Sequence, residues 1–228
     1  MRPSLIASLF ASLLCQAFAA NGASFDCGTS NSAQEKIICA DRTLSALDSE
    51  LSGMYFVALA ISPNPKQVRE KQRSWLAQSR NLCQAAACLK AAYEARLKEL
   101  DALADRHLIA FPATLSVSES FEASKSPYCQ SSGSGGYFSI DAKAGEGIVK
   151  VTLDGVHDCG RKVWGEIEGT GPVRGKLAII EFRGGFHDDN AKGKAILAVG
   201  RKRVVWKVFE EVEAESYVPR EQVFREAP

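Results

Sequence analysis

The stretch DALADRHLIAFPATLSV, residues 101–117, divides the chain into two parts of different composition. Before it, from residue 33 to about residue 105, Ala, Leu, Glu, Gln, Lys and Arg predominate and glycine is almost absent, as in helices. Beyond Phe111-Pro112 lie most of the 18 glycines, between short runs of Val, Ile, Phe and Trp that are typical of antiparallel strands. The chain is therefore predicted to be α+β, with a helical domain at residues 24–105 and an all-β domain at residues 111–228.

The helical part is predicted to contain four helices. Ser32, with Glu35 three residues later, forms a capping-box pattern that opens a short helix, and Asp41 can cap the next one. That second helix ends at Ser62-Pro63-Asn64-Pro65, because proline cannot continue the backbone hydrogen-bond ladder. Residues Ala85 to Ala87 connect a third helix to a fourth. Short connections between long helices place neighbours antiparallel, so we expect a helical hairpin or small bundle.

The second part is predicted to be an antiparallel barrel or sandwich, because its short apolar runs are separated by Gly, Asp and Asn. The tight turn of the last clear hairpin is predicted at Gly200-Arg201 or Arg201-Lys202. Residues 131–136 have the Ser/Gly composition of a flexible loop. The expected strands are Tyr137–Asp141, Ile148–Leu153, Val163–Glu168, Lys176–Arg183, Lys194–Val199 and Arg203–Glu210.

Residues 1–19 have the pattern of a secretory signal peptide. Arg2 precedes the apolar run Leu5–Leu14, and Ala17-Phe18-Ala19 places small residues at a cleavage site. The apolar run is too short to span a bilayer, and no later segment has 18 uninterrupted apolar residues, so no membrane span is expected after cleavage. Cys15 follows the bulky Leu14, which does not suit a lipoprotein signal, so we interpret it as part of the discarded peptide. We expect a periplasmic or secreted protein.

Cleavage leaves six cysteines, an even number that predicts three disulfides in an exported chain. Metal binding is the alternative, but the cysteine spacing matches no zinc module. In a helical hairpin that turns near Pro63, two of the cysteines lie at similar distances from the turn and are expected to meet at its open end. The expected pairs are therefore Cys39–Cys83, Cys27–Cys88 and Cys129–Cys159.

The charge balance and the missing motifs point to binding and not to catalysis. The chain has 28 basic and 27 acidic residues, and this near-neutrality argues against a nucleic-acid partner. It contains no Gly-x-Ser-x-Gly, His-Glu-x-x-His, phosphate-loop or EF-hand motif. We interpret Asp188 and Asp189 as a solvated turn, and Arg201-Lys202-Arg203 with nearby lysines as a charged hairpin end. We therefore expect no catalytic residue, no cofactor and no metal.

The helical part resembles a known family. Ser24-Phe25-Asp26-Cys27, Glu35-Lys36-Ile37-Ile38-Cys39-Ala40-Asp41, Gln72-Arg73-Ser74-Trp75-Leu76 and Tyr93-Glu94-Ala95-Arg96 look like the N-terminal domain of the LprI-like lysozyme inhibitors. The match covers about residues 24–101, and Asn81 departs from it because the family usually has Asp there. The matching positions outside the cysteines are Asp41, Asp48, Tyr55, Gln72, Trp75, Leu76, Arg80, Tyr93 and Arg96.

This resemblance implies a bacterial envelope protein that inhibits lysozyme-type glycoside hydrolases by protein–protein binding. The partner would be a lysozyme or another envelope protein. An inhibitor must address a cleft that holds two carboxylates, so a projecting Lys, Arg or Ser would suit, and several loops carry such residues. The alternative is a non-inhibitory binding module for a glycan, a peptide or an envelope protein. An exposed aromatic row on one β face would favour glycan binding, whereas a protruding cationic loop would favour hydrolase inhibition.

Overall fold

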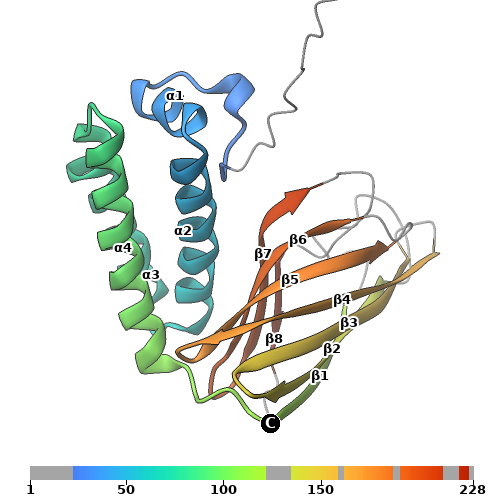
Figure 1. The fold of residues 1–228 in the computed structure, drawn as a ribbon. Coiled ribbons are helices and arrows are strands. Elements are labelled where there is room, and N and C mark those ends of the chain that lie inside the picture. The colour runs from blue at the N-terminus through green and yellow to red at the C-terminus, as the bar shows by residue number, and fades with distance from the viewer. Residues whose placement is uncertain (1–22, 122–134, 159–161, 187–190, 213–220, 226–228) are drawn as a thin grey trace, which may run out of the picture.

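The computed structural model describes residues 23–121, 135–158, 162–186, 191–212 and 221–225. Helices come first and one antiparallel sheet follows them, as Figure 1 shows. The α+β class is confirmed. The β part is a single, nearly closed, barrel-like sheet and not a sandwich of two sheets.

The helices begin where the sequence places their caps. Ser32 accepts a hydrogen bond from the Glu35 amide and the Glu35 carboxylate accepts one from the Ser32 amide, so the predicted capping box is present. Asp41 accepts from the amides of Thr43 and Leu44 at the start of the next helix. Pro65 occupies a first-turn position, where its missing N–H leaves no bond unmade. The helices are α1 Ala33–Ala40, α2 Arg42–Ile61, α3 Pro65–Gln78 and α4 Ala86–His107, with short 3-10 turns η1 Cys27–Thr29 and η2 Arg80–Leu82.

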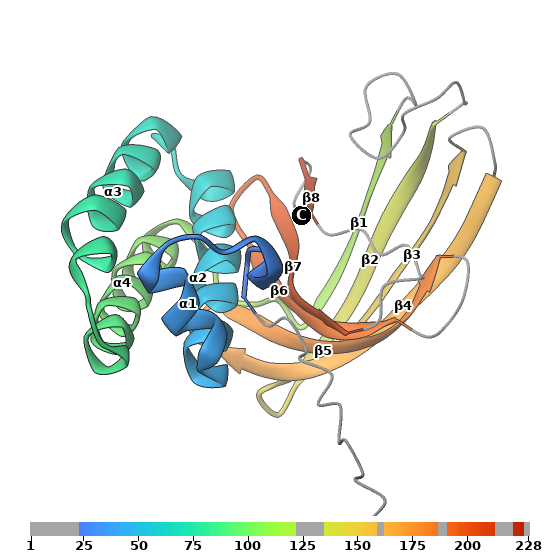
Figure 2. The same cartoon turned by 90° about the horizontal axis from the view of Figure 1, so that it is seen from above.

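Helix α2 packs between α4 and the outer face of the sheet (Figure 2). A Cβ at Gly53 would lie 2.9 Å from the Phe209 Cβ, so glycine is what allows α2 to approach the sheet this closely. Apolar side chains of the sheet, such as Ile196 and Val205, belong to the same buried cluster as the helices. Helix α2 is long and apolar enough to span a bilayer by length and composition alone. The sequence analysis did not identify it, because polar residues interrupt its apolar run. Its apolar residues here pack against α4 and the sheet.

Over the described ranges the sheet is an eight-stranded meander in which each strand pairs with the next. All six expected strands are present and most are longer than expected, while the first and last strands of the sheet were not predicted. The strands are β1 Thr114–Phe121, β2 Gly135–Gly145, β3 Ile148–Asp158, β4 Lys162–Arg174, β5 Leu177–Phe186, β6 Lys192–Val199, β7 Val204–Val212 and β8 Glu221–Phe224. Gly135 and Gly136 lie in β2 and not in the predicted loop.

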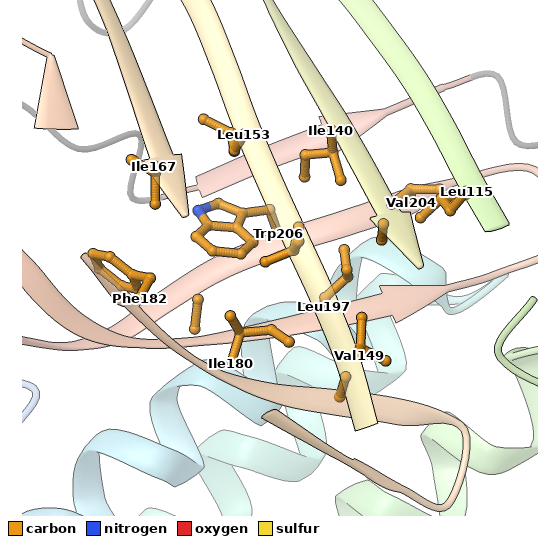
Figure 3. Close-up of a cluster of buried hydrophobic side chains, with 14 of the residues drawn as sticks. Leu115, Ile140, Val149, Leu153, Ile167, Ile180, Phe182, Leu197, Val204 and Trp206 are labelled. Carbon is orange, nitrogen blue, oxygen red and sulfur yellow. The ribbon is translucent and has the colours of Figure 1, made fainter. Parts of the chain in front are cut away.

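Alternation along the strands gives the sheet an apolar inner face and a largely polar outer face. Trp206 is fully buried inside, and its ring centroid lies 5.8 Å from that of Phe182. Figure 3 shows how Ile167, Leu153 and Ile140 surround this ring from neighbouring strands. The interior of the curved sheet is thus a packed core.

The predicted pairing of the helical cysteines is wrong. The structure joins Cys27 to Cys39 and Cys83 to Cys88. The prediction treated Cys39 as part of a helical hairpin, but Cys39 lies on the separate helix α1, which ends before α2 begins and pairs with the adjacent turn η1. Two disulfides indicate an oxidising, non-cytoplasmic environment. The signal peptide, the Cys129–Cys159 pair, residues 131–134 and residues 187–190 lie outside the described residues.

Candidate binding surfaces

The residues of the family-like pattern come together in the helical part, where they form a buried network. The Asp48 carboxylate accepts hydrogen bonds from the Tyr93 hydroxyl at 2.6 Å and from the Ser24 amide at 2.8 Å. The Tyr93 hydroxyl in turn accepts one from the Arg80 Nε at 3.0 Å. Arg80 also donates to the Asn81 side chain at 3.1 Å, so Asn81 keeps a hydrogen bond without a charge.

A second set of motif residues ties α3 to α4. The Arg96 Nε donates to the Gln72 side-chain oxygen at 3.0 Å, and the Trp75 indole donates to the Ala92 carbonyl at 3.3 Å. The Trp75 ring also meets the Tyr93 ring edge to face, with 5.3 Å between centroids. The loop backbone beside this set is bonded by Gln34, which donates to the carbonyls of Asn81 and Cys83.

These networks show that most residues of the family-like pattern stabilise the helical part. Asp48, Gln72, Arg80, Tyr93 and Arg96 are all buried, and burial raises the pKa of Tyr93 well above its usual value, so its hydroxyl stays protonated. Asp41 caps α2, whereas Tyr55 and Leu76 are only partly buried. A side chain that is buried and already hydrogen-bonded offers little to a partner. The candidate binding surfaces therefore lie elsewhere.

The first candidate is the turn between β6 and β7, which we call the cationic turn (residues 200–203). The Gly200 amide donates to the Arg203 carbonyl at 2.8 Å, so the predicted tight turn is confirmed with Arg201 and Lys202 at its tip. Both tip residues are exposed and form no ion pair with any residue in the described ranges.

The helix ends hold the cationic turn in place. The Arg203 guanidinium donates to the Ala60 carbonyl in the last turn of α2, where a cation also complements the helix dipole. On the other side, the Ile109 amide, just after α4, donates to the Val199 carbonyl at 2.9 Å. The tip is thus displayed from a base that two helices and two strands fix.

The second candidate is a groove on the outer face of the sheet, which we call the outer groove. Its main hollow has a volume of about 1470 Å³ and extends from β1 to β7. Two parallel rows of outward side chains line it. The rows are Ser116, Asp141, Thr152, Glu168, Arg183 and Lys192, and Thr114, Lys143, Lys150, Thr170, Glu181, Lys194 and Glu210.

The outer groove continues into a smaller hollow of about 570 Å³ beside α2. Thr170, Glu181, Lys194 and Glu210 line both hollows, and Ala46 and Glu50 of α2 form the far wall. The smaller hollow is partly apolar through Ile148, Pro172, Ile179 and Phe209. Ile148 is 49% exposed, which is unusual for a large apolar side chain in this structure.

Two carboxylates outside the outer groove have a pKa above the usual value. Burial raises the pKa of Asp101 on α4, while Arg174 opposes this shift. Burial also raises the pKa of Glu119, which lies on the inner side of β1, and Arg225 opposes it from 3.7 Å. Within the described ranges no cluster of three His, Cys, Asp or Glu residues could hold a metal ion.

Comparison with known proteins adds no relative: no family model, no curated protein and no solved structure matches the chain. The resemblance to the LprI-like family therefore stays a prediction from the residues of the helical part.

Proposed function

We propose that this chain is an exported bacterial envelope protein, periplasmic or secreted, that inhibits a lysozyme-type glycoside hydrolase by binding it. The family-like pattern of residues 24–101, the signal-peptide pattern and the two disulfides support this proposal. The observation that carries it is the cationic turn, whose tip residues Arg201 and Lys202 are exposed while its base is fixed. The contact is made by the protein surface and uses no metal or cofactor.

The chemistry of the target suits such a turn. Glycoside hydrolases of this kind have two carboxyl groups in their cleft, roughly 5–10 Å apart. Consecutive residues place two side chains on Cα atoms about 3.8 Å apart, and these long side chains can spread to reach both groups. The guanidinium of Arg201 can bind a carboxylate through two parallel hydrogen bonds, whereas the Lys202 ammonium acts as a point charge. Because the base of the turn is fixed, little conformational entropy is lost on binding.

The test is the lysis of a bacterial cell-wall suspension by a lysozyme panel, with and without a molar excess of the exported, oxidised chain. We expect at least one lysozyme to be slowed. The double substitution Arg201→Glu with Lys202→Glu should weaken that inhibition at least tenfold, because it replaces attraction to the cleft carboxylates with repulsion.

The matched control reverses two exposed lysines on the helices, Lys36→Glu with Lys98→Glu, and changes the net charge by the same amount. It should leave inhibition within about twofold. If the control weakens inhibition as strongly as the turn variant, the effect is one of net charge and the turn has no specific role. A chain that neither slows nor binds any lysozyme at micromolar concentration contradicts the proposal, and binding without inhibition favours the non-inhibitory module.

A further inference from the structure

Helix α3 carries basic side chains that the fold does not use. Lys66, Arg69, Lys71 and Arg73 are exposed, and none of these side chains forms a hydrogen bond or an ion pair with any described residue. The helix has one acidic residue, Glu70. The whole chain has 28 basic and 27 acidic residues, so α3 is a local concentration of positive charge on a nearly neutral protein.

The positions of these cations oppose the stability of the helix itself. Lys66 lies in the first turn, which has no acidic residue and where the positive end of the helix dipole disfavours a cation. Arg69 and Arg73 are four positions apart, a spacing at which like charges repel each other on a helix surface. Such departures from a local rule mark a candidate binding site, because an anionic partner replaces the repulsion with attraction.

The cations lie on both sides of the exposed part of α3. Lys66, Arg69 and Arg73 follow one another at positions i, i+3 and i+7, so they form a row about 10 Å long on one side. Lys71 lies on the other side, where it lines a groove of about 500 Å³ between α3 and α4.

The α4 side of this groove does not neutralise the cations of α3. Glu99 lines the groove, but Arg96 holds its carboxylate at 2.6 Å. Arg106 also lines the groove, is exposed and forms no ion pair within the described part of the chain. The charge that α3 and this groove present to a partner is therefore positive.

The shape and composition of this surface indicate the kind of partner. Helix α3 lies on the side of the helical part away from the sheet, as Figure 2 shows. Its exposed uncharged residues are Gln67, Ser74, Ala77 and Gln78, so it lacks the aromatic or apolar centre of a protein interface. The near-neutral charge of the chain argues against a nucleic acid. A bilayer surface with anionic headgroups fits, because it requires only positive charge on an accessible convex face.

We propose that α3 binds the surface of a membrane that contains anionic lipids, lying along the surface without inserting. The headgroup layer is about 5–8 Å deep, so long basic side chains on both sides of the helix can reach lipid phosphates. Each basic residue near such a surface strengthens binding about fivefold, and the net charge of α3 strengthens it about a hundredfold. Acidic residues more than about 10 Å away are screened. This site uses no residue of the cationic turn and does not depend on hydrolase inhibition.

The experiment measures sedimentation of the exported, oxidised chain with lipid vesicles at about 0.1 M salt. One set of vesicles contains phosphatidylcholine alone, and the other contains phosphatidylcholine and phosphatidylglycerol in equal parts. We expect at least tenfold tighter binding to the anionic vesicles, and loss of this binding at about 1 M salt. Inorganic phosphate should displace no more chain than sodium chloride of equal ionic strength, because the partner is a charged surface and not a free phosphate ion.

Variants locate the contact. Arg69→Glu with Arg73→Glu should weaken binding to anionic vesicles at least tenfold, whereas Arg69→Lys with Arg73→Lys should leave it within about twofold, because a lipid surface responds to charge. Lys36→Glu with Lys98→Glu is the control with an equal change of net charge, and it should also stay within about twofold. Circular dichroism and thermal unfolding confirm that each variant is folded.

Three results would overturn the proposal. They are equal binding to neutral and anionic vesicles, full binding by the folded Arg69→Glu, Arg73→Glu variant, and binding of duplex DNA or of an acidic protein without binding to anionic vesicles. The measurement contains no hydrolase, so a chain that inhibits no lysozyme but binds anionic vesicles through α3 would leave this proposal standing.

Discussion

At the scale of single residues, the hydroxyl of Tyr93 connects three elements of the helical part through hydrogen bonds. It donates to the Asp48 carboxylate and accepts from Arg80, so it links α2, η2 and α4. Removing the hydroxyl takes the hydrogen bonds in this network away from the buried Asp48 Oδ1 and the buried Arg80 Nε, while Ser24 still bonds Asp48 and Asn81 still bonds Arg80. The cost of such unpaired groups is larger than the value of the hydrogen bonds themselves.

We therefore predict that Tyr93→Phe lowers the free energy of unfolding by about 1–3 kcal/mol, measured by denaturant titration of the oxidised chain. The matched control is Tyr55→Phe, at a half-buried tyrosine on α2 that makes no hydrogen bond with any of the described residues. It should change the free energy by less than about 0.5 kcal/mol. Equal effects of the two substitutions would show that the network is not a source of stability.

Glu119 gives the second prediction at this scale. One of its carboxylate oxygens is buried and has no hydrogen-bond partner among the described residues. Because burial raises its folded pKa above the unfolded value, the folded state binds a proton more readily than the unfolded state. This group therefore lowers stability as pH rises through the unfolded pKa and then the folded pKa, and the loss is complete above the latter.

Glu119→Gln removes the ionised form, so it should raise the melting temperature at pH 7 and have a smaller effect at pH 4. Thermal unfolding at the two pH values is the measurement. A substitution that destabilises at pH 7 by more than at pH 4 would mean that the ion pair with Arg225 outweighs the cost of burial.

At the scale of elements, the sequence predicted features that depend on neighbouring residues, but it did not predict contacts between residues far apart in the chain. The capping box at Ser32 and the helix break around Pro63 are each patterns of only a few neighbouring residues. The start of α1 and the end of α2 that they predict are both confirmed. Strand β8 has only four residues and β1 alternates apolar residues with serine, so neither has the apolar run that identified the other strands. The Asp48–Tyr93 bond spans 45 positions, and only the packing of α2 against α4 creates it.

The disulfides show the same limit, since their pairing depends on where α1 folds back. Each bridge closes a short loop, with sequence separations of 12 and 5. In the chain-entropy model the first contributes about 3 kcal/mol and the second about 2 kcal/mol. We predict that Cys27→Ser with Cys39→Ser destabilises the chain more than Cys83→Ser with Cys88→Ser.

Urea unfolding of the two double variants measures this difference, and peptide mapping without reductant checks the pairing directly. Fragments that join Cys39 to Cys83 would contradict the structure. The two double variants, each lacking one bridge, also serve as controls for each other because both remove two cysteines.

At the scale of the whole molecule, the two faces of the sheet form different contacts. The inner face is filled by its own core, and the outer face is divided between α2 and the outer groove. The cationic turn lies where the ends of α2 and α4 meet the sheet. None of its tip residues lines the outer groove, so the two surfaces can be occupied and tested separately.

The sequence alone indicated the turn and its charge, but it could not rank it above other loops. The tip stands out only because the structure shows Arg203 engaged with the end of α2 while Arg201 and Lys202 remain exposed. The outer groove was not predicted, because its two rows are assembled from strands whose register no local pattern specifies.

The central claim is that the cationic turn is the contact with a lysozyme-type hydrolase. Hydrogen–deuterium exchange of the exported, oxidised chain, with and without the lysozyme that it inhibits best, tests this most directly. We predict slower exchange on binding at residues 198–204 and at the C-terminal ends of α2 and α4, with residues 141–152 of the outer groove unchanged. Unchanged exchange at residues 198–204, with protection elsewhere on the chain, would contradict the account.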